Sequence, residues 1–173
     1  MTSAADPLTL VLVGPMAAGK TSVGRRVARR LGVAFIDTDR RIVAAHGPIP
    51  GIFAAHGEAY FRDLERAAVA EALEEGGVVS LGGGAVTEAA TRELLSAHPV
   101  VFLTVSADAV VDRLRGGNRP LLAGEEDPVE RWKNIFEERR GWYAEVASTT
   151  FDTSRRPMQK IADEIVAWRR EQR

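Results

Sequence analysis

The chain alternates short, continuous apolar runs with longer segments whose apolar residues recur at helical spacing. The run Leu8–Val13 is apolar at nearly every position, which is typical of a strand that is buried on both faces. A strand with one solvent-exposed face would instead alternate apolar and polar residues. This pattern predicts strands at Leu8–Val13, Val33–Ile36, Val78–Leu81, Val100–Val105 and Thr149–Asp152.

Amphipathic helices are predicted between these strands. In the segment 20–31 the apolar residues Val23, Val27 and Leu31 recur at every fourth position, with arginines on the other faces. Prolines and glycines interrupt the pattern at residues 47–57 and predict a broken stretch between two helices. The predicted helices are Lys20–Leu31, Arg40–His46, Glu58–Glu74, Thr87–Ala97, Ser106–Arg115, Pro128–Ala147 and a last one that begins near Pro157.

Strands that alternate with helices of this length predict βαβ units, and therefore a parallel sheet with helices on both faces. We expect a three-layer α/β/α architecture of the α/β class, with about five parallel strands in one domain over residues 1–173. In such sheets ligands bind beyond the carboxyl ends of the strands. The residues that follow each strand are therefore the first candidates for a functional site.

Composition excludes several classes of protein. The 173-residue chain has no cysteine, which excludes disulfide scaffolds, iron–sulfur clusters and thiolate zinc sites. A net charge of −1 provides no basic field for nucleic acid. No apolar run approaches the ~20 residues of a membrane span, and residues 1–6 lack the pattern of a signal peptide. We therefore expect a cytoplasmic protein without nucleic-acid or membrane partners.

The first predicted strand is followed by Gly-Pro-Met-Ala-Ala-Gly-Lys-Thr at residues 14–21, a phosphate-binding loop. Its glycines let successive backbone N–H groups curl around phosphates, and the helix that begins there adds its positive end. Lys20 brings a compact ammonium to the β- and γ-phosphates, and the Thr21 hydroxyl is suited to Mg²⁺. The residues expected to bind ATP here are Gly14, Ala17, Ala18, Gly19, Lys20, Thr21 and Ser22.

Two further segments follow strands. Asp37 and Asp39 come after the second strand, and in extended chain they would face the same side, one toward a metal and one toward a phosphate acceptor. A plain helix-capping role for these aspartates is the alternative. The third strand is followed by the glycine turn Gly82–Gly84, where motor ATPases and switch GTPases carry an acid. The turn therefore argues against those classes and favours close approach of a small substrate, and a simple tight turn is the alternative.

These motifs stand in an order found in one known family. The phosphate loop, Asp37-Thr38-Asp39, Phe61-Arg62, the glycine turn and Arg-Pro-Leu-Leu at residues 119–122 follow one another as in the shikimate kinases, which the chain resembles from Leu8 to Trp168. The loop alone is widespread, whereas the combination is far more specific. The resemblance implies a P-loop kinase fold that transfers the γ-phosphoryl group of ATP to the 3-hydroxyl of shikimate. The reaction lies on the pathway to chorismate and aromatic amino acids, with Mg²⁺ as cofactor.

The resemblance also implies roles for individual residues. Asp39 would bind the shikimate hydroxyls, with Lys20 and Arg119 completing the catalytic set, and Asp37 would join Thr21 on the metal. The carboxylate of shikimate would lie between Arg62 and Arg139, since paired guanidinium groups bind a carboxylate well. The implied shikimate-binding residues are Asp39, Arg62, Gly82, Gly83, Gly84 and Arg139, with Glu65 steadying either the ring hydroxyls or Arg62. Arg119 and Arg156 are implied to contact ATP.

The chain also departs from the family pattern. Residues 113–126 form a Gly-rich lid that is about two residues short, so either Arg113 or Arg115 would pack on adenine, and the loop at Arg155–Pro157 is one residue short. Within the acceptor-binding region 37–66, Pro50-Gly51 predicts a later helix start. A gluconate kinase or an idle nucleotide-binding module is the alternative function, and we expect a monomer that binds ATP and shikimate.

Overall fold

The computed structural model describes residues 8–115 and 127–173. Its five strands are β1 (Thr9–Val13), β2 (Phe35–Asp37), β3 (Gly77–Ser80), β4 (Val100–Thr104) and β5 (Thr149–Asp152). The helices are α1 (Lys20–Leu31), α2 (Thr38–His46), α3 (Ile49–His56), α4 (Glu58–Glu75), α5 (Ala89–Leu95), α6 (Ala107–Arg115), α7 (Pro128–Val146) and α8 (Met158–Glu171), with a 3-10 turn η1 at Ala85–Thr87.

The five described strands form one parallel sheet in the order β2-β3-β1-β4-β5. In register, Val11 of β1 lies opposite Val79 of β3 on one side and Val100 of β4 on the other. The predicted parallel α/β fold is confirmed. Because all strands run the same way, the segments that follow them meet at one edge of the sheet.

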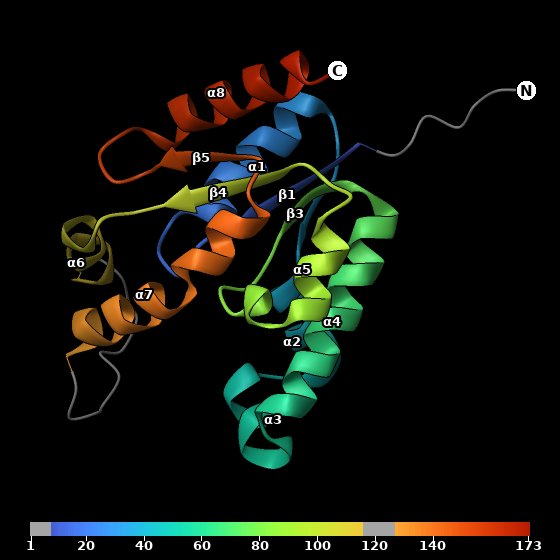
Figure 1. Ribbon diagram of the computed structural model, residues 1–173, viewed down its shortest axis with the longest axis vertical. Coiled ribbons are helices and arrows are strands. Elements are labelled where there is room, and N and C mark those ends of the chain that lie inside the picture. Colours follow the sequence, from blue (N-terminus) through green and yellow to red (C-terminus); the bar gives the residue numbers. More distant parts are fainter. Residues whose placement is uncertain (1–7, 116–126) are drawn as a thin grey trace, which may run out of the picture.

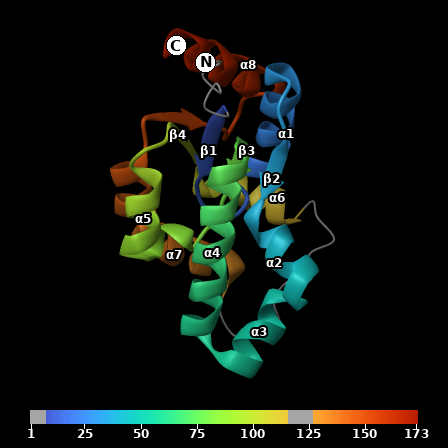
Figure 2. The same cartoon turned by 90° about the vertical axis from the view of Figure 1, so that its right-hand side faces the viewer.

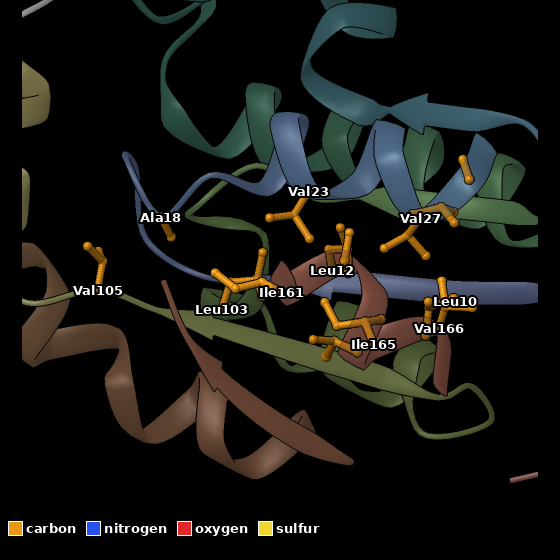
Figure 3. Packing of buried hydrophobic residues seen from close by; sticks show 14 of the residues in the cluster. Leu10, Leu12, Ala18, Val23, Val27, Leu103, Val105, Ile161, Ile165 and Val166 are labelled. Atoms are coloured by element: carbon orange, nitrogen blue, oxygen red, sulfur yellow. The ribbon is translucent and has the colours of Figure 1, made fainter. Parts of the chain in front are cut away.

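Alternate residues of β1 supply the cores on the two faces of the sheet. Leu10 and Leu12 pack in the core that α1 and α8 complete, and Figure 3 shows Val23 and Ile161 beside Leu12. Val11 and Val13 point to the other face, which α4, α5 and part of α7 cover (Figures 1 and 2). Both faces of β1 are fully buried, which explains its continuous apolar run.

A third, smaller core lies away from the sheet. Ile42 of α2, Ile52 of α3 and Phe61 of α4 form it, and α3 projects at the bottom of Figure 1. The sequence pattern missed α3, because residues 47–57 were predicted as a broken stretch with a late helix start. The helix instead begins at Ile49 and takes Pro50 into its first turn, where proline loses no helical hydrogen bond.

Two further boundaries differ from the sequence prediction. The single helix expected over Thr87–Ala97 is divided into η1 and α5, because Glu88 is extended and the Thr87 hydroxyl donates a 2.7 Å hydrogen bond to the Gly84 carbonyl. The helix expected from Arg40 begins at Thr38, which places Asp39 in its first turn. Among the described residues, no helix has the length and apolar character needed to cross a membrane.

Candidate active site

The phosphate loop connects β1 to α1 through unusual backbone conformations. Gly14 has a φ of 152°, and a Cβ there would overlap the carbonyl oxygen of Leu103 on β4. Ala17 has a φ of 69°, the one positive value at a non-glycine among the described residues. The loop therefore lies directly against the neighbouring strand and curls at the start of α1, as an anion-binding loop requires.

Lys20 bends back over this loop. Its ammonium donates hydrogen bonds to the carbonyls of Gly14 at 2.7 Å and Pro15 at 3.0 Å. Burial lowers the pKa of Lys20 to about 8, although the charges of Asp39 and Asp37 act in the opposite direction. Lys20 is thus a positive charge held in a poorly hydrated place, where it acts strongly on a nearby anion.

Asp37 and Asp39 lie on the opposite wall of the cleft. Asp37 caps α2 by accepting a hydrogen bond from the Arg40 amide at 3.1 Å, so the capping interpretation is confirmed for this residue. The expected extended geometry is wrong, because Asp39 lies in the first helical turn. Both side chains nevertheless line the same cleft.

Asp39 is electrostatically unusual. Burial raises its pKa above the ordinary value of 3.8, and the charge of Asp37 raises it further, against the opposing effects of Lys20 and Arg62. Its Oδ1 atom is buried and has no hydrogen-bond partner in the described part of the protein. A buried carboxylate oxygen with an unused acceptor position is suited to receive a donor such as a substrate hydroxyl.

The three glycines of the turn each lie against a different predicted site residue. A Cβ on Gly82 would fall 2.5 Å from Asp39 Oδ1, and one on Gly84 would fall 2.5 Å from Arg62 Nη2. The corresponding position on Gly83 is 3.6 Å from Arg139 Nη1. A Cβ at Gly82 or Gly84 would displace Asp39 or Arg62, whereas one at Gly83 would make only an ordinary contact. Glycine is therefore needed for space at Gly82 and Gly84, and the simple tight-turn interpretation is insufficient there.

Arg62 is a buried arginine with a buried acidic partner. It is 8% exposed, and it forms a 2.7 Å ion pair with Glu65, which is 2% exposed. A weaker contact of 3.5 Å reaches Glu58. The Nε atom of Arg62 is buried and has no hydrogen-bond partner among the described residues. Glu65 therefore fixes the guanidinium and leaves donor capacity for a ligand.

These elements enclose a cleft of about 760 Å³ at the carboxyl edge of the sheet. Two residues of the phosphate loop, Gly14 and Ala18, do not line the cleft. Three predicted acceptor residues lie next to the lining residues without lining the cleft themselves: Arg62, Gly84 and Arg139. The predicted residues that line the cleft are Ala17, Gly19, Lys20, Thr21, Ser22, Asp37, Asp39, Gly82 and Gly83.

The arginines predicted near ATP are placed differently. Arg113 lines the cleft, and its guanidinium donates to the Ala17 carbonyl at 2.7 Å and to both the hydroxyl and the carbonyl of Thr153. Arg156 pairs with Glu164 and lines a separate depression beside Asp152, so the structure does not bring it into the cleft. Arg119, the lid residues 116–126 and the side chain of Arg115 lie outside the described residues.

Sequence reasoning missed three residues that contact the site loops. Trp132 donates from Nε1 to the Met16 carbonyl at 2.8 Å, and Tyr143 donates to the Gly83 carbonyl at 2.5 Å. The Thr153 hydroxyl donates to the Ala18 carbonyl at 2.7 Å. Aromatic residues on a helix are typical core residues, so the sequence carried no signal for the contacts of Trp132 and Tyr143.

A phosphate loop that shares a cleft with carboxylates, with two arginines beside it, is typical of an ATP-dependent small-molecule kinase. A family model described as shikimate kinase matches residues 16–170. The chain therefore belongs to the shikimate kinase family.

Individual relatives agree with this assignment. The shikimate kinase of Corynebacterium efficiens is 46% identical over 159 residues, which covers 91% of this chain and 94% of that protein. The structure of shikimate kinase from Acinetobacter baumannii in complex with shikimate superposes with a TM-score of 0.86 at 36% identity, covering 96% of this chain and 95% of that one. A gluconokinase from Sinorhizobium meliloti is less similar, with a TM-score of 0.62 at 25% identity over 94% and 91%.

Proposed function

We propose that this protein transfers the γ-phosphoryl group of ATP to the 3-hydroxyl of shikimate, giving shikimate 3-phosphate and ADP. One observation carries the proposal: the turn Gly82–Gly84 lies against Asp39, Arg139 and Arg62 in succession. A single small surface thus meets one acid and two cations, which matches an acceptor with hydroxyls and a carboxylate. Of these groups, Asp39 and Arg62 lie within residues 37–66.

Each group has a distinct task in the transfer. The acceptor oxygen attacks the γ-phosphorus, the bond to the bridging oxygen of ADP breaks, and the hydroxyl proton passes to Asp39. Phosphoryl transfer has a loose transition state, so Asp39 mainly orients the hydroxyl and accepts its proton late. The Lys20 ammonium and the N–H groups of the loop stabilise the negative charge on the transferred group.

Mg²⁺ is expected to accompany ATP. Thr21 and Asp37 line the same cleft and offer a hydroxyl and a carboxylate oxygen, the hard ligands that Mg²⁺ prefers alongside phosphate and water. They therefore fit the ion, which would neutralise charge between the β- and γ-phosphates. Because Asp37 also caps α2, the backbone fixes the direction of its carboxylate.

The nucleotide base would lie at the other end of the cleft. Arg113 and Met158 line the cleft beside the phosphate loop, and the Arg113 guanidinium is held by Ala17 and Thr153. A guanidinium fixed in this way presents a flat cationic face, which stacks well on an aromatic base. We therefore assign Arg113 as the arginine beside adenine.

An acceptor assay tests the proposed function directly. With ATP and Mg²⁺ present, we expect shikimate to be phosphorylated with a kcat/KM at least about 100-fold above that for gluconate, because a linear acid cannot satisfy the same set of buried polar groups. ADP release coupled to a dehydrogenase reports the rate, and mass spectrometry identifies the product. Equal rates with gluconate would instead support the gluconate kinase alternative.

Arg62→Lys tests the carboxylate site. Lysine keeps the charge but replaces the planar fork by a point charge, so we expect the KM for shikimate to rise roughly 10- to 100-fold while the KM for ATP changes little. The matched control is Arg66→Lys one turn along α4, since Arg66 is half-exposed and pairs with Asp63. A shikimate KM at the wild-type value would place the carboxylate elsewhere.

A further inference from the structure

Helix α7 contributes residues to both of the cores that flank the sheet. Trp132, in its first half, belongs to the core beneath α1 and α8, whereas Tyr143, near its end, belongs to the core beneath α4 and α5. Phe136 lies between them and packs against both cores. In Figure 1 α7 begins below α6, which follows the carboxyl end of β4, and runs beneath the sheet to the start of β5.

The aromatic rings of α7 are in continuous contact. Ring centroids are 5.2 Å apart for Trp132 and Phe136 and 6.3 Å for Phe136 and Tyr143, and Tyr143 continues to Phe102 of β4 at 5.2 Å. Trp132 and Tyr143 are about three helical turns apart, so their side chains leave the same face of the helix. This aromatic row therefore has a fixed length and direction.

Each end of the row is hydrogen-bonded to a different substrate loop. The Trp132 indole N–H donates to the Met16 carbonyl of the phosphate loop at 2.8 Å. The Tyr143 hydroxyl donates to the Gly83 carbonyl of the glycine turn at 2.5 Å. Trp132 is 4% exposed and Tyr143 is 1% exposed, so water does not compete well for either bond.

Tyr143 stays a donor over the working pH range. Burial raises its pKa to about 12, against the opposing effects of Arg139 and Arg62. The Arg139 guanidinium lies beside the same hydroxyl, so one tyrosine contacts both the glycine turn and an arginine assigned to the acceptor. Arg139 itself comes from the stretch of α7 between the two aromatic residues.

We propose that α7 sets the relative position of the two substrates, with Trp132 as the positioning residue for the phosphate loop and Tyr143 as the positioning residue for the glycine turn and Arg139. The inference rests on the proposed function. In-line transfer requires the attacking oxygen and the phosphorus to be positioned to within a few tenths of an ångström of the reactive geometry. Small displacements from that geometry lower the rate strongly. A rigid helix that is hydrogen-bonded to both loops satisfies this requirement.

Tyr143→Phe and Trp132→Phe test the proposal by their opposite effects. Tyr143→Phe keeps the ring contacts and removes one hydrogen bond, so we expect the KM for shikimate to rise about three- to tenfold while the KM for ATP stays within twofold. For Trp132→Phe we expect the KM for ATP to rise while the KM for shikimate stays within twofold. Because tyrosine is protonated throughout, the Tyr143→Phe effect is the same from pH 6 to pH 9.

Matched controls separate positioning from packing. Trp168→Phe makes the same chemical change as Trp132→Phe on α8, outside the cleft lining. This variant is expected to keep wild-type KM values. Since Trp132→Phe also leaves a space, a benzothiophene analogue of the indole at position 132 keeps the shape and lacks only the N–H. It should reproduce the change in KM for ATP.

Hydrogen exchange gives a readout that does not depend on the substrate. We expect faster amide exchange in residues 82–85 of Tyr143→Phe, with exchange in residues 14–19 unchanged. In Trp132→Phe we expect faster exchange in residues 14–19, with exchange in residues 82–85 unchanged. Unchanged exchange and KM values, or equal changes at both loops in both variants, would overturn the proposal. Wild-type protein that fails to phosphorylate shikimate would refute the proposed function, while the exchange pattern would still decide the role of α7.

Discussion

Asp39→Asn is expected to lower kcat about 100- to 1000-fold while the KM for ATP stays within twofold. Asparagine keeps the shape of the side chain but cannot accept the hydroxyl proton, and its amide cannot replace both carboxylate oxygens. The lost function belongs to the acceptor side, because Asp39 Oδ1 lies against Gly82 of the glycine turn. Steady-state kinetics with each substrate varied in turn measure the change.

The same substitution is expected to raise the melting temperature at pH 7. Burial and the charge of Asp37 raise the pKa of Asp39, so the folded protein holds this proton more tightly than the unfolded chain does. The stability linked to the protonated form is complete below about pH 4 and is lost as the pH rises through the raised pKa. The gain from Asp39→Asn should therefore be larger at pH 7 than at pH 4.5.

Asp63→Asn provides the control for both effects. Asp63 is an exposed residue of α4 that pairs with Arg66, so its neutralisation should change neither kcat nor the melting temperature appreciably. An Asp39→Asn variant with wild-type kcat would remove Asp39 from the mechanism. A lower melting temperature at pH 7 would show that the carboxylate is stabilising and that its electrostatic environment is misassigned.

Lys20→Met is expected to lower kcat/KM for ATP roughly 1000-fold, because it removes the ammonium that stabilises the transferred phosphoryl group. The wild-type profile of kcat/KM against pH should fall on the alkaline side near pH 8, where the free protein loses this proton. Lys20→Arg keeps a charge that does not titrate in this range. The Lys20→Arg variant should have a lower kcat/KM than wild type, and its pH profile should lack the decrease near pH 8.

Lys160→Met serves as the control, since Lys160 is an exposed residue of α8. Lys20→Met is expected to lower activity but to raise the stability of the folded protein. Burial lowers the pKa of Lys20 below its ordinary value of 10.5, so stability is complete at high pH and is lost as the pH falls through about 8. Lys20→Met should therefore melt at a higher temperature than wild type at pH 7. An alkaline limb that persists in Lys20→Arg would assign the titration to another group.

The sequence predicted those features that depend on local pattern. The buried strand Leu8–Val13, the phosphate loop after it and the parallel sheet follow from continuous apolar runs and glycine spacing, and the structure confirms the fold. Helix α3 was missed because proline was treated as a breaker, although the first helical turn accepts it. The strand order is a property of long-range pairing that no local pattern encodes.

The same distinction holds within the candidate site. Lys20 and Asp39 stand in recognisable motifs, whereas the contacts of Trp132 and Tyr143 join residues far apart in the chain to backbone carbonyls. A backbone carbonyl has the same chemistry at every residue, so its partner leaves no trace in the sequence. Arg156 shows the opposite case, since a plausible motif position is paired with Glu164 outside the cleft.

The turn Gly82–Gly84 constrains how the acceptor preference of such a kinase could evolve. Each of its three positions faces a different functional side chain, so a mutation that adds even a methyl group at Gly82 or Gly84 collides with Asp39 or Arg62. Adaptation to a new acceptor has to come from α2, α4 and α7, whose side chains reach toward the turn. The turn is thus the sterically constrained wall of the pocket, and changes in acceptor preference would arise from side chains on the surrounding helices.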